Sequence, residues 1–395
     1  MNKSLLTMMM LFLIVVGSVS CGEVQRTPTT TPDKIATGVA EVKAIAATLT
    51  AEVSITENKT SSTDTPISQT ITESAFAPLP KMREVITTEN CGKVTELMQW
   101  NADGEAERLA ISSDMKWMAI SSKSGTHLYD FRRISQVRFL PVEFDPNVHE
   151  GSEIAFSPNG KLLADWSGNV WNIPEGTKQY TLQPTSVGKS FGLPSVGFSP
   201  DGTVLATYVE TGINLWRVTD GTLLKQLDQC AGQGVYFSPD GSHIVSVFGA
   251  PLSGLSSFIA LCRVSDGALI YKASDNTYYW YSSSALSPDG TVLAAGLTNG
   301  TVELRHAADG GLIQMFNTRN EGDDSSWVIG LAFSPNGEIL ATYSSDLKLW
   351  RVSDFTLLHS VNSDLFILWT FAFTPDGKAI VAHPVRDSIF WWGIP

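Results

Sequence analysis

One short unit returns along residues 83–395 and restricts the possible folds more than any other feature of the sequence. The unit consists of an apolar dipeptide or tripeptide, a Ser-Pro-Asp/Asn-Gly turn, an alternating apolar run, a second turn and a strand that often ends in Leu-Trp. Its turn glycines are 39 to 49 residues apart, and a period of about 40 to 45 residues is typical of propeller blades rather than of helical solenoids. These glycines are Gly160, Gly202, Gly241, Gly290, Gly337 and Gly377.

The chemistry of the unit predicts strands joined by tight turns. Proline at the second turn position presets φ, and glycine at the fourth tolerates a positive φ, so the chain reverses between two strands. Residues 204–208 are rich in β-branched and aromatic side chains and have no helical period. A sheet of four such strands cannot bury both faces alone, whereas a radial stack of sheets can.

A degenerate seventh copy opens the series, with residues 113–116 in the turn position and residues 117–120 in the following strand. We therefore predict an all-β fold, a seven-bladed β-propeller, over residues 83–395. The last copy stops after its third strand, residues 389–392, while residues 91–97 resemble the turn and outer strand of a standard copy. We expect a strand from Val94 to about Trp100 to complete the seventh blade.

The repeats resemble the WD-repeat family over roughly the last four fifths of the chain. The resemblance rests on Leu-Trp or similar pairs and on Asp-Gly turns: Val170-Trp171, Leu215-Trp216, Leu349-Trp350, Trp391-Trp392, Asp220-Gly221 and Asp266-Gly267. Tyr129, Cys262 and Arg305 stand where a repeat would offer Trp, and the family's Gly-His and Trp-Asp pairs are absent, so its hydrogen-bonded tetrad is not carried over. Ser-Pro-Asp-Gly also occurs in propellers similar to TolB.

Residues 1–20 have the pattern of an export signal. Lys3 precedes an apolar run over residues 5–16, and small residues follow; the run is too short to span a bilayer as an ordinary helix. Cys21 and Gly22 then resemble the lipobox of bacterial lipoproteins, with Ser18 where that family usually has Leu. The resemblance implies acylation of Cys21 and an extracytoplasmic location, lipid-anchored to the bacterial cell membrane. The alternative is an ordinary secretory signal with an incidental cysteine.

Residues 21–82 are predicted to be a flexible linker. They are rich in Thr, Ser, Ala and Pro, and Phe76 is their only aromatic residue. Such a segment cannot bury enough apolar surface to offset its ordering entropy. Residues 35–52 contain helix-favouring Ala, Glu and Lys, but their Thr content favours a mostly flexible spacer.

Charge and cysteine content exclude some classes of partner and site. The formal net charge of −13 and the pI of about 4.9 disfavour binding to nucleic acid or to anionic lipid head groups. After Cys21 only Cys91, Cys230 and Cys262 remain, with no CxxC spacing, so the sequence indicates neither a zinc cluster nor a disulfide framework. A single bridge is left open.

Motifs for catalysis are sparse. The sequence has no HExxH, GxxxxGK[ST] or GxGxxG pattern. Residues 188–192 (GKSFG) match a hydrolase elbow, but no helix is predicted after them, so a glycine-rich loop is the better interpretation. His149 and His383 fall on the predicted top face, fewer than the three or four converging ligands that a metal needs. We predict no catalytic residue, no cofactor and no metal.

The WD-repeat resemblance implies that the Ser-Pro-Asp-Gly turns lie on one face, the turn face, and that the loops between blades open on the other, the top face. Consecutive aromatic residues and acidic residues fall in those loops, and aromatic side chains suit binding hot spots. Trp327 and Trp369 are expected to pack between blades instead. The predicted partner-binding residues are Tyr278, Tyr279, Trp280, Phe366, Asp323 and Asp324.

These observations favour a non-enzymatic, monomeric binding or scaffold protein outside the cytoplasm, whose top-face loops recognise a protein, a peptide or a glycan. The alternative is an extracytoplasmic hydrolase or lyase that uses carboxylates at the funnel of the propeller, because paired carboxylates can perform acid/base chemistry when one pKa is raised.

Overall fold

The computed structural model describes residues 82, 84–101, 106–122, 124–142, 153–165, 167–182, 195–209, 212–230, 232, 234–249, 257–274, 279–320, 327–361, 368–384 and 388–395. The expected signal peptide, the acylation site at Cys21 and the linker up to residue 81 lie outside these residues. Within them, no helix has both the length and the apolar character needed to cross a membrane.

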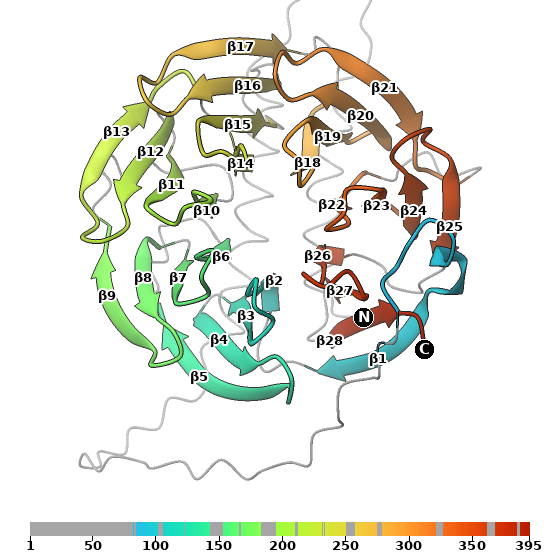
Figure 1. Ribbon diagram of the computed structural model, residues 1–395, viewed down its shortest axis with the longest axis horizontal. Coiled ribbons are helices and arrows are strands. Elements are labelled where there is room, and N and C mark those ends of the chain that lie inside the picture. Colours follow the sequence, from blue (N-terminus) through green and yellow to red (C-terminus); the bar gives the residue numbers. More distant parts are fainter. Residues whose placement is uncertain are drawn as a thin grey trace, which may run out of the picture. The chain divides into compact units, whose positions relative to one another are not determined.

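Seven four-stranded antiparallel sheets, the blades, are arranged in a ring (Figure 1), so the predicted all-β, seven-bladed propeller is confirmed. Blade 1 contains β2 Ala106–Ile111, β3 Trp117–Ser122, β4 Gly125–Asp130 and β5 Ser135–Pro141. Blade 2 contains β6 Ile154–Phe156, β7 Leu162–Asp165, β8 Asn169–Asn172 and β9 Thr177–Thr181. Blade 3 contains β10 Val196–Phe198, β11 Val204–Val209, β12 Gly212–Arg217 and β13 Leu223–Leu227. Blade 4 contains β14 Gly234–Phe237, β15 His243–Phe248, β16 Phe258–Arg263 and β17 Leu269–Ser274. Blade 5 contains β18 Tyr281–Leu286, β19 Val292–Leu297, β20 Thr301–His306 and β21 Leu312–Asn317. Blade 6 contains β22 Gly330–Phe333, β23 Ile339–Tyr343, β24 Leu347–Arg351 and β25 Leu357–Val361.

The seventh sheet combines strands from both ends of the described chain. It contains β26 Leu368–Phe373, β27 Ala379–Pro384, β28 Ser388–Gly393 and, as its outer strand, β1 Thr95–Asn101. β1 runs antiparallel to β28, with Thr95 opposite Gly393 and Trp100 opposite Ile389. A 3₁₀-helix, η1 Cys91–Lys93, precedes β1. The inner strand of each blade contacts that of the next, from β2 around to β26 and back to β2.

Each Ser-Pro-Asp-Gly turn is held by the side chains of its own serine and aspartate. In blade 3 the Ser199 hydroxyl donates to the Asp201 carboxylate over 2.6 Å and accepts the Val204 amide over 2.9 Å. Gly202 has φ +71°, a conformation that favours glycine. The same hydroxyl-to-carbonyl or hydroxyl-to-carboxylate bond recurs in all seven turns, whose first residues are Ser112, Ser157, Ser199, Ser238, Ser287, Ser334 and Thr374.

The turns of neighbouring blades also pack on one another. A methyl group built on Gly202 would lie 3.5 Å from Cδ of Pro158 in the preceding blade, and the same relation joins Gly241 to Pro200 and Gly337 to Pro288. Every one of these positions is the fourth residue of one turn against the second residue of the turn before it. A methyl group at these three positions would be in ordinary van der Waals contact with the proline, so glycine is needed there for its positive φ, whereas at Gly290 a methyl group would also overlap Cδ of Pro239.

The third strands show how the degenerate repeats are accommodated. Strand pairing places Tyr129, Trp171, Trp216, Cys262, Arg305, Trp350 and Trp392 at equivalent positions. The indoles of Trp216 and Trp350 donate to the hydroxyls of Thr207 and Thr342 over 2.9 Å. In blade 5 the Arg305 guanidinium instead contacts the buried Glu303 carboxylate at 2.8 Å.

Blade 4 replaces the tryptophan with a disulfide. Cys262 in β16 is bonded to Cys230, which follows β13 of blade 3, and both are fully buried. The sequence left this bridge open, because cysteine count and spacing cannot show which pair meets in space. The bond connects two neighbouring blades, and Cys91 remains a buried free thiol.

Candidate functional site

An aromatic cluster lies at the top-face end of blades 5 and 6. Tyr279 is 46% exposed, and Trp327 is 41% exposed. The Trp280 ring, half-buried, meets the Trp327 ring edge to face, with centroids 5.7 Å apart. Trp280 immediately precedes β18 and Trp327 precedes β22, so two blades contribute to the cluster. We call Tyr279, Trp280 and Trp327 the aromatic cluster.

Hydrogen bonds to backbone groups hold in place the segments that carry the two tryptophans. The Trp280 amide donates to the Thr298 hydroxyl over 3.3 Å, and the Thr298 amide donates back to the Trp280 carbonyl over 3.1 Å. The carbonyl of Val328, next to Trp327, accepts the hydroxyls of Ser282 and Ser283, each over 2.7 Å. These bonds tie the entry to blade 6 onto blade 5, so the rings are presented by rigid elements rather than by a loop alone.

Glycine is required where these two segments meet. A methyl group on Gly296 of β19 would lie 2.6 Å from the Val328 side chain and from the Ser283 hydroxyl. Without a side chain at Gly296, the chain before β22 can approach β19 closely enough for the Val328 amide to donate to the Leu297 carbonyl over 3.2 Å. The position of Trp327 therefore depends on Gly296.

The structure describes only some of the residues that the sequence singled out. Tyr279 and Trp280 lie side by side in the chain at the top-face end, whereas Tyr278, Phe366, Asp323 and Asp324 lie outside the described residues. Trp327 contacts the neighbouring blade through Trp280, as expected, but its side chain stays 41% exposed instead of being buried between the blades. Its position directly before an inner strand suggested burial, but the strand begins only at Gly330.

The described residues contain no cluster of three or more His, Cys, Asp or Glu that could hold a metal ion. His383, expected near the top face, lies near the end of β27 that is away from the turn face, where it is 1% exposed and neither ring nitrogen has a hydrogen-bond partner. Burial, with a smaller contribution from Arg108, lowers the pKa of His383 to about 4, so the ring is neutral at physiological pH. The predicted segment 188–192 and His149 lie outside the described residues.

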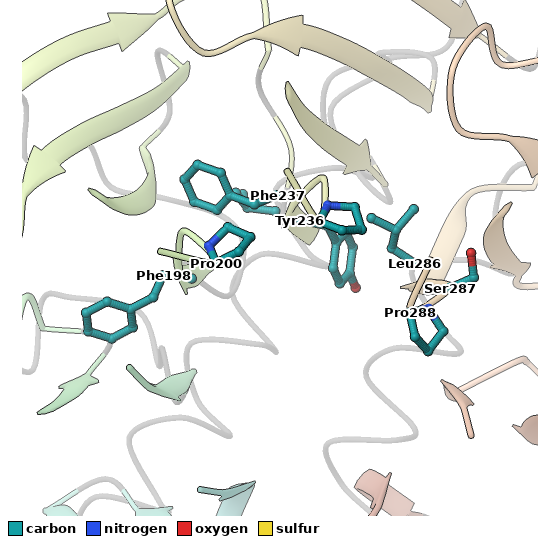
Figure 2. Close-up of a pocket in the computed structure, with 10 residues that line it drawn as sticks. Phe198, Pro200, Tyr236, Phe237, Leu286, Ser287 and Pro288 are labelled. Atoms are coloured by element: carbon teal, nitrogen blue, oxygen red, sulfur yellow. The ribbon is translucent and has the colours of Figure 1, made fainter. Parts of the chain in front are cut away.

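A pocket of about 340 Å³ opens at the turn-face end of blades 3, 4 and 5 (Figure 2). Its lining comes from the ends of three inner strands and from the prolines of the turns that follow them: Gly197, Phe198, Pro200, Val235, Tyr236, Phe237, Pro239, Leu286, Ser287 and Pro288. The Tyr236 hydroxyl donates to the Ser284 carbonyl over 2.6 Å. Burial raises the pKa of Tyr236 to about 12, so it remains a neutral donor.

Sequence reasoning missed this pocket. The prolines signalled only tight turns, because the sequence does not show which turns face a common space. The signal that could have suggested it is the large apolar residue that precedes the turn serine in each of these three copies, at Phe198, Phe237 and Leu286.

Comparison with known proteins finds relatives that are 26 to 28% identical to the chain. No protein-family model matches it. It is 28% identical over 248 residues to the periodic tryptophan protein 2 homolog of Dictyostelium discoideum, a match that covers 60% of this chain and 25% of that protein. It is 26% identical over 264 residues to protein tipD of the same organism, covering 60% of this chain and 39% of that protein.

A third similarity is to human apoptotic protease-activating factor 1, 26% identical over 162 residues, 40% of this chain and 12% of that protein. The chain thus spans less than half the length of the curated relatives it matches. The similarity, the repeated turn chemistry and the seven four-stranded blades agree with one another. Together they support the assignment of this chain as a seven-bladed β-propeller with repeats similar to those of the WD-repeat family.

Proposed function

We propose that this chain is a non-enzymatic, extracytoplasmic recognition protein that binds a protein partner through the aromatic cluster on its top face. The observation that carries the proposal is the exposure of Tyr279 and Trp327 beside Trp280. Tyr and Trp bury a large area on binding and lose few rotatable bonds, and they are enriched at the energetic centres of interfaces.

Protein is the partner class that the fold favours, since WD-repeat propellers generally bind protein partners. The rigid presentation of the cluster adds to this argument, because anchors that are already ordered lose less entropy on association. A peptide or a glycan that stacks on the exposed rings would use the same side chains.

The proposed location rests on two independent features. Cys21 and Gly22 follow an export-like segment and would provide the site of a lipid anchor. The buried Cys230–Cys262 disulfide supports the same location, because disulfides persist in oxidising compartments and are rare in the cytosol. In this arrangement the linker is followed in the chain by residues 84–94, which include η1, and then by β1, which pairs with β28.

Site-specific photo-cross-linking on the full-length chain in its native envelope tests the recognition surface. A photoreactive residue at Tyr279 should give one discrete adduct whose partner mass spectrometry identifies. The matched control is the same residue at Leu312, which is 50% exposed on the outer strand β21. The same adduct from both positions would contradict a top-face site.

The identified partner then permits a quantitative test. Tyr279→Ala combined with Trp327→Ala should weaken the purified complex by about 100-fold, the magnitude expected for two interface hot spots. Binding unchanged by the double variant would place the contact elsewhere on the protein.

Metabolic labelling with an alkyne fatty acid tests the anchor. The full-length chain should incorporate the label and sediment with membranes, and Cys21→Ser should lose the label and be released. Equal labelling of both chains would contradict acylation at Cys21.

A further inference from the structure

The turn face is electrostatically divided, and the pocket lies in its acidic part. In blades 7, 1 and 2 the residue after the turn glycine position is a lysine: Lys378, Lys116 and Lys161. In blades 3, 4 and 5 the same position holds Thr203, Ser242 and Thr291, and in blade 6 it holds Glu338. At this position blades 7, 1 and 2 therefore present a positive charge, blades 3, 4 and 5 present none, and blade 6 presents a negative one.

The aspartates of blades 3, 4 and 5 remain ionised and exposed beside the pocket. Asp201, Asp240 and Asp289 each accept the hydroxyl of their turn serine at 2.5 to 2.6 Å and a backbone amide at 3.0 Å. Hydrogen bonds from the turn serine are the largest cause that lowers the pKa of each carboxyl. None of the three forms a salt bridge with a cation among the described residues, whereas Asp114 of blade 1 pairs with Lys116 at 2.7 Å.

Charges farther out on the turn face do not neutralise this region. The turns between the third and fourth strands carry their own ion pairs, Arg217 with Asp220, Arg263 with Asp266 and Arg351 with Asp354, at 2.7 to 3.1 Å. Each of these arginines is paired within its own turn. The three aspartates at the pocket thus add an uncompensated negative potential to a chain whose net charge is −13.

The lining determines the apolar part of a ligand. Pro200, Pro239 and Pro288 are exposed at the rim, while Phe198, Tyr236, Phe237 and Leu286 are half-buried beneath them. Figure 2 shows the labelled side chains in an arc from Phe198 through Tyr236 to Leu286 and Pro288. Grooves lined by aromatic side chains suit extended proline-containing segments. A pocket of about 340 Å³ is at the small end of ligand sites, room for a few side chains rather than for a large cofactor.

We propose that the turn-face pocket of blades 3, 4 and 5 is a second binding site, which takes an extended segment of a partner protein where proline or leucine lies next to lysine or arginine. The apolar residues fill the space between Phe198, Tyr236 and Leu286. The basic side chains lie against Asp201, Asp240 and Asp289. This site is at the opposite end of the ring from the aromatic cluster, so the two can be occupied independently.

Fluorescence anisotropy with three labelled peptides and the full-length protein tests the chemistry of the ligand. The probe GKPLPKRG combines the apolar and basic features, GEPLPEEG reverses the charge, and GKGSGKRG removes the apolar residues. Saturable binding should be restricted to GKPLPKRG and should weaken as salt is added. Equal binding of all three peptides, or no binding of GKPLPKRG, would overturn the proposal.

The chain itself suggests conservative variants for the acidic rim. Asn159 and Asn336 occupy the aspartate position in blades 2 and 6, and each accepts the turn hydroxyl at 2.7 to 2.8 Å, so asparagine preserves the turn. Replacing Asp201, Asp240 and Asp289 together with Asn should weaken GKPLPKRG about tenfold and reduce its salt dependence. Asp114→Asn, in the blade 1 turn, is the matched control and should leave the affinity unchanged. Equal effects of the triple variant and the control would contradict a local charge contribution.

The chain also suggests a conservative variant that tests the contribution of the apolar lining to binding. Ser113 stands at the proline position in the turn of blade 1, so Pro200→Ser with Pro288→Ser is compatible with the turn. This variant should bind GKPLPKRG about fivefold more weakly while its melting temperature shows that it is folded. Tyr279→Ala with Trp327→Ala should not change this affinity, which separates the pocket from the proposed top-face function.

The chain's own residues 76–83 (FAPLPKMR) also combine apolar and basic residues, and their role can be distinguished. Deletion of residues 73–81 should leave the affinity for GKPLPKRG unchanged if the occupant belongs to a partner. A higher affinity after the deletion would show that the chain's own segment competes for the pocket and would overturn the assignment to a partner protein.

Discussion

At the scale of single residues, the ring depends on small groups at defined places. The turn hydroxyls bond across each reversal, and the turn glycines lie against the proline of the preceding blade, most closely at Gly290. These local contacts are repeated around the turn face. A substitution at one of these glycines should therefore lower the free energy of unfolding by an amount that depends on how closely the neighbouring blade approaches it.

Gly290 and Gly337 form a matched pair for testing this interpretation. Both have a positive φ, +73° and +75°, so alanine is strained at either position. At Gly290 the new methyl group would also overlap Cδ of Pro239, whereas at Gly337 it would lie 3.7 Å from Cδ of Pro288. Gly290→Ala should lower the free energy of unfolding by about 3 kcal/mol and Gly337→Ala by about 1 kcal/mol. Urea denaturation measures both, and equal losses would argue against contact between the turns.

His383 predicts a pH dependence of stability. Its pKa in the folded protein, about 4, is below the ordinary value of 6.5. The unfolded chain therefore binds the proton more readily, and the contribution is complete above pH 6.5 and is lost as the pH falls from 6.5 toward 4. The loss should approach about 3 kcal/mol. His383→Phe should remove this part of the pH dependence of the unfolding free energy, and parallel curves for the two proteins would contradict it.

At the scale of elements, equivalent third strands use different side chains for the same structural purpose. Trp216 donates to a threonine within its own blade, Arg305 contacts a buried glutamate, and Cys262 is bonded to the preceding blade. Each of these side chains occupies the third-strand position at which a regular copy has tryptophan. The degenerate repeats thus retain the strand register while their side-chain interactions differ.

The disulfide between blades 3 and 4 should contribute measurably to stability. Cys230 and Cys262 are 32 residues apart, and replacing both with Ala should lower the free energy of unfolding by about 3 kcal/mol, since the bond restricts the unfolded chain. Reductant should lower the melting temperature of the natural chain and should have no effect on the double variant. Cys91→Ala, which leaves the bond intact, should respond to reductant like the natural chain.

At the scale of the whole molecule, a ring of blades has no free end only if its last sheet is complete. β28 pairs with β27 on one side and with β1 on the other. Without β1, the backbone groups of β28 that face it would be exposed at an unpaired edge, and such edges promote aggregation. The arrangement of the blades around the ring also sets the charge distribution, since the lysine-bearing turns and the acidic turns occupy different parts of the turn face.

Truncation tests the contribution of β1 to the ring. Deletion of residues 83–101 should give a chain that aggregates or unfolds without a cooperative transition, as followed by size-exclusion chromatography and thermal unfolding. Deletion of residues 22–81 is the control and should leave the melting temperature unchanged. A soluble monomer with full cooperativity after the first deletion would show that β1 is dispensable for closure.

The blade count, the four strands of a blade and six of the seven turn positions were predictable from the sequence because they depend on local chemistry, whereas the degenerate turn of blade 1 lies at residues 112–115, one residue before the predicted position. Ser-Pro-Asp-Gly specifies its own reversal through bonds among residues at most five positions apart, as Ser199, Asp201 and Val204 show. The exposed position of Tyr279 followed from consecutive aromatic residues. The exposure of Trp327 was not predictable because its environment is provided by Trp280, 47 residues earlier in the chain.

The sequence alone thus determined that the chain forms a seven-bladed β-propeller, because each repeat carries its own turn and strand chemistry. Only the tertiary structure decided which side chains of different blades meet. That applies to the pairing of Cys230 with Cys262, the contact between Trp280 and Trp327 and the pocket beside Asp201, Asp240 and Asp289. The physical reason is that these contacts depend on how the blades are placed around the ring, and residue spacing within a repeat does not contain that information.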